Sequence, residues 1–190
     1  SLNYDLCIEL ALADANVERG FDTEESGYWN FRRFIQPLEN IDVFLYKLHG
    51  SVDWERDINT KRLTYSNGES SNPAWIFGTQ YKMQYIDPYL FLFSEFRRRI
   101  FESKLIVSIG YSFFDEHING VISDALRDNP DRKLISVSLK LKKEDIEKRP
   151  NIDNHIINQI IPISDKTARE FIESNLTKDY LNQYFEEEEI

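Results

Sequence analysis

Cysteine and histidine are scarce in this sequence, and long apolar runs are absent, which narrows what the protein can do. The 190 residues include one cysteine, so neither an internal disulfide framework nor a zinc site built from several cysteines is possible within the chain. No apolar run approaches the ~20 residues that a membrane-spanning helix needs, and no signal peptide opens the sequence. These absences predict an intracellular, cytoplasmic protein that does not use a membrane as partner.

Net positive charge is also lacking, because the formal charge is −10. A surface for long nucleic acids is usually basic, so nucleic acid is not an expected partner. The dense basic cluster at residues 97–99 has helical spacing and predicts a solvated helix face. Hydrophobic residues at 41% and charged residues at 29% indicate a globular chain with a sizeable core.

The apolar pattern predicts one α/β domain over residues 1–176 and an acidic helical tail over 177–190. Strands and helices follow the period-2 and period-3.6 patterns and the turn signals between them. Helices are expected at residues 4–15, 89–103, 118–129 and 164–176, the last capped by Ser164 and Asp165. Strands are expected at 42–48, 74–78, 104–110, 133–139 and 159–164, with a small β-hairpin insertion formed by 51–57 and 61–66.

The clearest unit is strand, helix, strand over residues 104–139. The β-branched run at 104–110 indicates a strand covered on both faces, and the order predicts a parallel βαβ unit. We therefore expect a Rossmann-like parallel sheet with flanking helices. Ligands of such sheets bind beyond the carboxyl ends of the strands, so residues 3–5, 49–50 and 110–112 are expected on one rim.

Polar groups gather where the strand at 104–110 is expected to end. Gly110 would let the backbone approach a ligand, and Ser112 supplies a hydroxyl and free amides near a helix start, which favours phosphate. Asp115 is placed to cap that helix, and a plain capped turn explains the pattern about as well. Asn119 lies just inside the helix. The single glycine does not make a complete dinucleotide fingerprint.

Two further groups lie at the other expected strand ends. Asp5 caps the first helix or contacts a ligand, and Asn3 could hold a water or a ribose hydroxyl. His49 follows a buried run and precedes Gly50. It is either an ordinary strand-end histidine or a base, since an unperturbed imidazole titrates near ~6.5. His155, in a polar stretch, is expected on the surface.

Taken in order, "SLNYD", "KLHGSVDW" and "LIVSIGYSFFDEHIN" resemble the sirtuin-like (silent-information-regulator-like) domain family over about residues 1–140. Many members of that family act in bacterial antiphage defence as NAD hydrolases. The resemblance implies catalytic roles for Asn3 and His49. It implies contacts to NAD for Asp5, Gly50, Gly110, Ser112, Asp115 and Asn119.

Departures from the family pattern refine this expectation. Protein-deacylating sirtuins carry four cysteines on a zinc ribbon, which one cysteine cannot build, so a deacylase and a zinc ion are not expected. The family's glycine-rich phosphate loop precedes the "NxD" motif, and this sequence starts at that motif. The first βα unit would then lie upstream. The 190-residue chain alone is expected to be inactive and to associate with itself or with a fused or partner domain.

Two functions remain open from the sequence. One is an NAD glycohydrolase that releases nicotinamide and ADP-ribose. The other is a non-catalytic module that senses NAD or ADP-ribose without turning it over.

Overall fold

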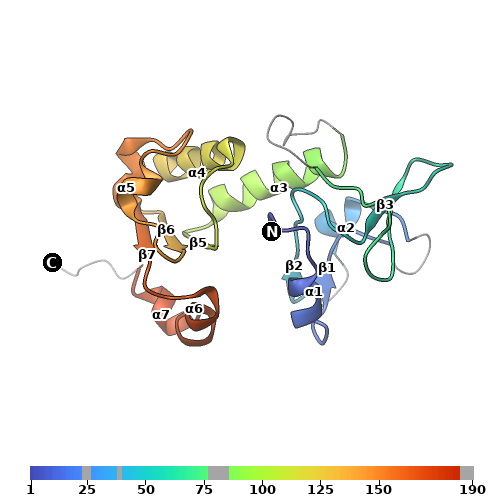
Figure 1. Cartoon of the computed structure of the whole chain (residues 1–190), viewed down its shortest axis with the longest axis horizontal. Coiled ribbons are helices and arrows are strands. Elements are labelled where there is room, and N and C mark those ends of the chain that lie inside the picture. The colour runs from blue at the N-terminus through green and yellow to red at the C-terminus, as the bar shows by residue number, and fades with distance from the viewer. Residues whose placement is uncertain (23–26, 38–39, 77–85, 185–190) are drawn as a thin grey trace. The chain divides into compact units, whose positions relative to one another are not determined.

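A computed structural model describes residues 1–22, 27–37, 40–76 and 86–184 of the chain (Figure 1). The chain divides into two compact units, Ser1–Phe96 and Arg97–Ile190, which are described separately below. The helix α3 (Tyr89–Glu102) contains the boundary between them and confirms the helix expected at 89–103. Together the two units contain the mixed α/β structure that the sequence predicts.

The second unit is built on a three-stranded parallel sheet in the order β5 (Leu105–Ile109), β6 (Lys133–Val137), β7 (Ile160–Ile163). The register pairs Leu105 with Lys133 and Leu134 with Ile160. The helix α4 (Glu116–Asp128) connects β5 to β6. The parallel βαβ unit expected from the sequence is confirmed.

Helices cover both faces of this sheet. The helices α4 and α5 (Lys143–Ile146) lie on one side, and α6 (Ala168–Ser174) and α7 (Lys178–Asn182) lie on the other (Figure 1). A 3₁₀ helix, η1 (Asn154–Gln159), precedes β7. The apolar face of β6 packs on α6 through Ile135, Val137 and Phe171, each at most 1% exposed. The central strand therefore sits in an apolar core, as a parallel strand should.

The expectation that residues 104–110 are covered on both faces is wrong. Residues 105–108 of β5 are only half-buried, and Ile109 is 36% exposed. The buried strand is β6, because it has a paired neighbour on each side within the described sheet. The same apolar composition therefore serves both an edge strand and a central strand.

The cap expected at Ser164 and Asp165 is also wrong. Helix α6 begins after Thr167, whose hydroxyl accepts from the Glu170 amide at 3.2 Å. The Glu170 carboxylate accepts from the Thr167 amide at 2.7 Å, which completes a capping box. The helical tail expected at 177–190 is present as α7 up to Asn182, and residues 185–190 lie outside the described part.

The first unit is made of short elements. In chain order they are α1 (Cys7–Ala11), β1 (Val17–Glu18), α2 (Arg32–Ile35), β2 (Val43–Phe44), β3 (Trp54–Arg56) and β4 (Leu63–Tyr65). Strands β1 and β2 pair in parallel. Strands β3 and β4 pair antiparallel, which confirms the predicted hairpin.

Three expectations for this unit were too long or fall partly outside the description. The helix expected at 4–15 covers only Cys7–Ala11, and the strand expected at 42–48 pairs only at Val43–Phe44. In the expected strand at 74–78, Trp75 forms an isolated bridge with Gly50, and residues 77 and 78 lie outside the described residues.

Aromatic rings and buried charges fill the first unit. Phe34 stacks on Tyr46 at 4.8 Å between ring centroids, and Phe21 meets Trp54 edge-on at 5.5 Å.

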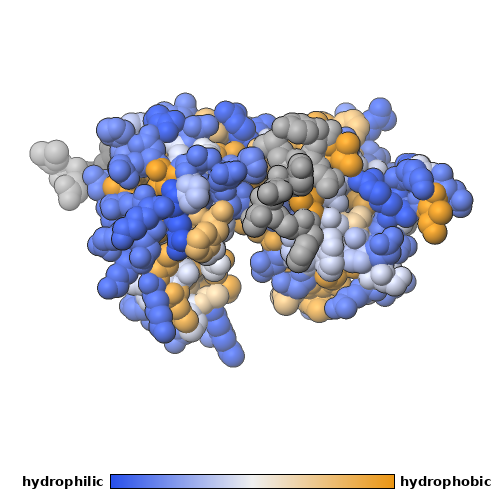
Figure 2. Space-filling model, turned by 45° about the horizontal axis from the view of Figure 1, so that its top comes forward, coloured by the Kyte–Doolittle hydropathy of each residue, from blue (hydrophilic) through white to orange (hydrophobic). Residues whose placement is uncertain are grey.

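Hydrophilic residues dominate the surface of both units on the face shown in Figure 2. Within the described ranges, no helix is long and apolar enough to cross a membrane.

Candidate functional site

The "NYD" segment has alternating exposure that places Tyr4 inward between two polar residues. Asn3 and Asp5 are exposed, whereas Tyr4 is half-buried. The Tyr4 carbonyl accepts from the Val52 amide at 2.9 Å, and its phenol donates to the Ile76 carbonyl at 2.6 Å. The segment is therefore fastened to two distant stretches of the first unit through the residue between its two polar side chains.

His49 is held at the same place. The Ile76 amide, on the residue that accepts from the Tyr4 phenol, donates to the His49 carbonyl at 2.8 Å. The His49 imidazole lies 6.4 Å from the Tyr4 ring, between centroids, and the residue is 8% exposed. The first unit thus brings together the "NYD" segment and His49, two motifs that lie more than forty residues apart in sequence.

Asp5 lies one residue before the N-cap of α1, which is Leu6 and has no side-chain cap, so the expected cap is replaced by a local turn bond. The Asp5 Oδ1 accepts from the Cys7 amide at 3.0 Å at the start of α1. This hydrogen bond lowers the pKa of the Asp5 carboxyl below its usual value. The side chain remains exposed, so a contact to a ligand stays a prediction.

Gly50 is required by the backbone on either side of it. Its φ is +90°, and a Cβ there would lie 2.5 Å from the Ala74 carbonyl oxygen and 2.8 Å from the Trp75 Cα. A side chain would therefore displace the 74–75 segment. Gly50 lets that segment pass directly behind the His49 backbone.

In the second unit, Gly110 ends β5 on an open surface. Its φ is +72°, no atom lies within 4 Å of where a Cβ would stand, and its amide donates to the Val137 carbonyl at 2.8 Å. Ser112 is exposed two residues later. The turn has the free space that a ligand approaching the backbone needs, and its role in binding stays a prediction.

Asp115 caps α4, as the sequence indicates. Its carboxylate accepts from the amides of His117 at 3.2 Å and Ile118 at 3.4 Å, and the residue is 4% exposed. Asp115 therefore fixes the start of α4 just after the Gly110 turn.

Asn119 is fully buried, and its side chain is used within the protein. Its Nδ2 donates to the carbonyls of Phe113 at 2.9 Å and Pro150 at 2.7 Å, and its Oδ1 accepts from the Tyr111 hydroxyl at 2.7 Å. Burial and the nearby Asp115 charge raise the pKa of Tyr111, which keeps its phenol protonated as a donor. Asn119 shapes the 110–115 turn through these bonds. A direct contact to a ligand is untested.

The predicted site residues therefore fall into two groups, each within one unit. Residues 3, 5, 49 and 50 belong to the first unit, and residues 110, 112, 115 and 119 belong to the second. The expectation that both groups share one rim stays a prediction. His155 is exposed, as expected.

Sequence reasoning missed a group of buried charges beside the "NYD" segment. Lys47 is 1% exposed and lies 3.4 Å from a Glu9 carboxylate oxygen, and Arg19 pairs with Asp53 at 2.6 Å. Arg19 also lies 3.6 Å from Glu9. One feature of the sequence could have indicated this burial. Lys47 lies inside the apolar run "FLYKL", among residues that are expected to be buried.

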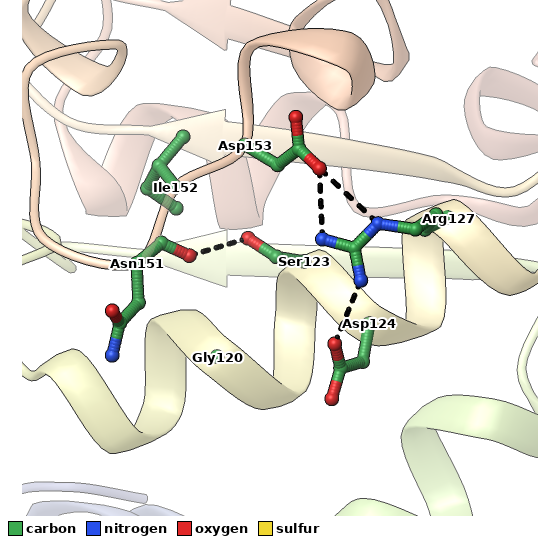
Figure 3. Close-up of a pocket in the computed structure, with 7 residues that line it drawn as sticks. All are labelled: Gly120, Ser123, Asp124, Arg127, Asn151, Ile152 and Asp153. Atoms are coloured by element: carbon green, nitrogen blue, oxygen red, sulfur yellow. Dashed lines mark hydrogen bonds and ion pairs between the residues drawn. The ribbon is translucent and has the colours of Figure 1, made fainter.

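A separate shallow pocket of about 340 Å³ lies on α4 away from the predicted residues (Figure 3). Arg127 crosses it, with its guanidinium bound to Asp153 at 2.8 Å and Asp124 at 2.9 Å. Ser123 donates to the Asn151 carbonyl at 2.7 Å. These groups satisfy one another, and none belongs to the predicted site. Across the described ranges, no three potential metal-ligating side chains cluster.

Comparison with known proteins gives the family. No curated protein matches this sequence significantly. A family model described as the SIR2-like domain matches residues 1–158, a span that includes every residue discussed above from Asn3 to Asp153. The match covers most of the chain and contains both motif groups, and the chain therefore belongs to the SIR2-like domain family.

Proposed function

We propose that this protein hydrolyses NAD to nicotinamide and ADP-ribose. SIR2-like domains use NAD, so an NAD-related function holds at the level of the family. The hydrolytic reaction is our inference for this member. The observation that carries it is the hydrogen-bonded attachment of Tyr4 and His49 to Ile76. Because both residues bond the backbone of Ile76, this attachment supports a fixed distance between the "NYD" segment and His49.

The reaction breaks the bond between the ribose C1′ and the nicotinamide nitrogen. The bonding electron pair leaves with nicotinamide, and an oxocarbenium-like C1′ accepts the oxygen of a water molecule. One proton is released, and His49 takes it up as a general base, from the attacking water or a ribose hydroxyl. The Ile76 amide holds the His49 backbone, which fixes the point from which the imidazole extends.

Asn3 orients the ribose or the water. Its side chain is exposed beside Tyr4, so it reaches a ligand without leaving a buried position empty. Asp5 faces the same ligand, and its low pKa keeps it negatively charged near the developing cation at C1′. Both residues work from a segment fixed by Tyr4.

Gly110 and Ser112 of the second unit present an open turn before α4. We propose that this turn contacts NAD. We further propose a role as the effector domain of a bacterial antiphage-defence system, in which assembly or a partner domain controls NAD cleavage.

Nicotinamide release from NAD by the full-length protein tests the reaction. We expect His49→Gln and Asn3→Ala each to lower turnover by about 10²- to 10⁴-fold, the usual cost of losing a general base or a positioned group. His155→Gln is the matched control, because it removes an exposed histidine outside the site. Melting temperatures should stay close to wild type in all three variants.

The alternative function is an NAD or ADP-ribose sensor that performs no hydrolysis. The exposed carboxylate and amide of the "NYD" segment would serve recognition equally well. Calorimetric binding of NAD together with a nicotinamide release rate equal to buffer would favour the sensor. A melting temperature that fell steeply in both site variants would instead assign His49 and Asn3 to stability alone.

A further inference from the structure

A buried lysine is bonded to the backbone of the "NYD" segment. Lys47 is 1% exposed, and its ammonium donates to the carbonyl oxygen of Asp5. It also lies 3.4 Å from the carboxylate of Glu9, which belongs to α1. A single ammonium therefore contacts the turn that carries Asn3 and Asp5 and the helix that follows it.

Lys47 stands two residues before His49 in the same stretch of chain. Two backbone hydrogen bonds to the first residues follow it in the chain, from the Leu48 amide to the Ser1 carbonyl at 3.1 Å and from the Val52 amide to the Tyr4 carbonyl at 2.9 Å. The ammonium adds a charged contact to these neutral ones. Charge-assisted hydrogen bonds are about twice as strong as neutral ones and fix geometry more tightly.

Stability alone does not explain a charge at this place. Among the described residues, no hydrogen-bond donor reaches either carboxylate oxygen of Glu9, although cations of Lys47 and Arg19 lie at 3.4 and 3.6 Å. Buried ion pairs of this kind are often no more stable than apolar residues of the same volume. The gain therefore lies in the position that the ammonium imposes on the segment it touches.

We propose that Lys47 is a positioning residue that sets the place of Asn3 and Asp5 relative to His49, and that Glu9 balances its charge. The functional part rests on the proposed NAD hydrolysis. The structural part, that the ammonium holds the "NYD" segment in place, is measured independently of activity.

The test compares two double variants of the full-length protein. Lys47→Met/Glu9→Gln removes the ammonium and the opposing charge together, so no unpaired charge remains buried. Arg33→Met/Glu18→Gln is the control, because this pair lies 3.0 Å apart in the same unit, with side chains 19% and 2% exposed, and makes no hydrogen bond to the "NYD" segment within the described residues. Both should fold, since each loses a complete pair.

Hydrogen exchange of the Val52 amide, which donates to Tyr4, reports the segment directly. We expect about tenfold faster exchange in the Lys47 double variant, as follows from the loss of one charge-assisted hydrogen bond. For NAD cleavage we expect kcat to fall about 10²-fold, the cost of a 1 Å misplacement, while KM changes less than threefold. The control pair should change neither quantity.

Unchanged exchange at Val52 overturns the inference, whether or not the protein cleaves NAD. Faster exchange with an unchanged kcat also overturns it, because Lys47 would then be merely structural. A wild-type protein that releases no nicotinamide refutes the proposed hydrolysis, and exchange alone then decides what Lys47 holds. Should the double variant not fold, Lys47→Gln keeps a donor for the Asp5 carbonyl and should give an intermediate exchange rate.

Discussion

The two units of this chain reach a defined structure by different means. In the second unit, strands of four or five residues and a 13-residue helix enclose apolar side chains such as Leu134 and Ile135, both 0% exposed. In the first unit, strands have two or three residues, and the buried groups include Glu18, Lys47 and Asp53. Both units bury polar groups, among them Asn119 and Arg132 in the second, but the second has a regular sheet and helix around an apolar core, whereas the first joins short segments through charges and hydrogen bonds.

This difference separates the two halves of the predicted site as well. Hydrogen bonds between residues far apart in sequence hold Tyr4 and His49, whereas the Gly110 turn follows directly from a regular βαβ unit. Polar anchoring places individual atoms precisely, but it depends on every partner being present. Apolar packing tolerates change better and places atoms less exactly.

The two units can be followed separately in one experiment. All three tryptophans, at positions 29, 54 and 75, lie in the first unit. Tryptophan fluorescence during urea unfolding therefore reports the first unit, and far-UV circular dichroism is weighted toward the helices of the second. A substitution in one unit should therefore change one of these two signals more than the other.

The largest effect is expected from breaking a charge pair in the first unit. Asp53→Ala leaves the Arg19 guanidinium, now 2.6 Å from the Asp53 carboxylate, without that partner. We expect the free energy of unfolding measured by fluorescence to fall by about 3–5 kcal/mol. The double variant Arg19→Met/Asp53→Leu should recover most of this loss. If the single variant lost less than about 1 kcal/mol of unfolding free energy, the Arg19–Asp53 pair would not hold the unit together.

The second prediction concerns the apolar core of the other unit. Ile135→Ala removes a fully buried side chain from β6 and should cost about 2–5 kcal/mol by circular dichroism, because a cavity remains beside Phe171. Ile172→Ala in α6 is the control, since that side chain is 50% exposed and should change stability by less than about 0.5 kcal/mol. Equal costs would mean that β6 is not a packed strand.

Two aspartates near helix starts, Asp115 at α4 and Asp5 before α1, give a smaller contrast between the units. Asp115→Ala removes the cap of the 13-residue α4 and should cost about 1 kcal/mol. Asp5→Ala removes the corresponding contact from the five-residue α1, which has less helix to lose, so its cost should be smaller. A larger loss for Asp5 would indicate that the "NYD" turn, rather than α1, depends on the carboxylate.

The smallest effect is a pH dependence of the second unit. Burial raises the pKa of Tyr111, so the folded protein keeps a proton that the unfolded chain loses above about pH 10. The folded state then binds more protons, and stability falls as the pH rises above that value. Tyr111→Phe should make the decline between pH 9 and 11 shallower by about 0.5 kcal/mol per pH unit, allowing for solvent screening. An identical slope would contradict a buried, protonated Tyr111.

The sequence predicted the second unit better than the first, for a physical reason. Apolar periodicity is a local signal, and β5, α4 and β6 were found because each follows it. The cap at Asp115 was likewise found from its local pattern, whereas Asp5 bonds the Cys7 amide from one residue before the N-cap.

Contacts over long distances in sequence leave no such pattern. The helix expected at 4–15 was too long, and the helix that forms, α1, buries none of its residues. The Tyr4 phenol bonds the Ile76 carbonyl, more than seventy residues away. The burial of Lys47 was missed because lysine is almost never fully buried. The rule that ligands bind at the carboxyl ends of strands put residues 3–5 and 49–50 on one rim, and family resemblance gave Asn3 and His49 their catalytic roles.

The alternation around Tyr4 has a consequence for how this segment tolerates change. Successive side chains of an extended segment point to opposite sides, so the two-residue step between Asn3 and Asp5 is what puts both outside while Tyr4 reaches inward to the Ile76 carbonyl. Substituting either polar residue leaves that anchor intact. Inserting one residue between them would turn one polar side chain inward, and deleting the residue between them would remove Tyr4 and its anchor. The spacing of the "NxD" motif is therefore a constraint on length, and variation at this site can proceed by replacement but not by insertion.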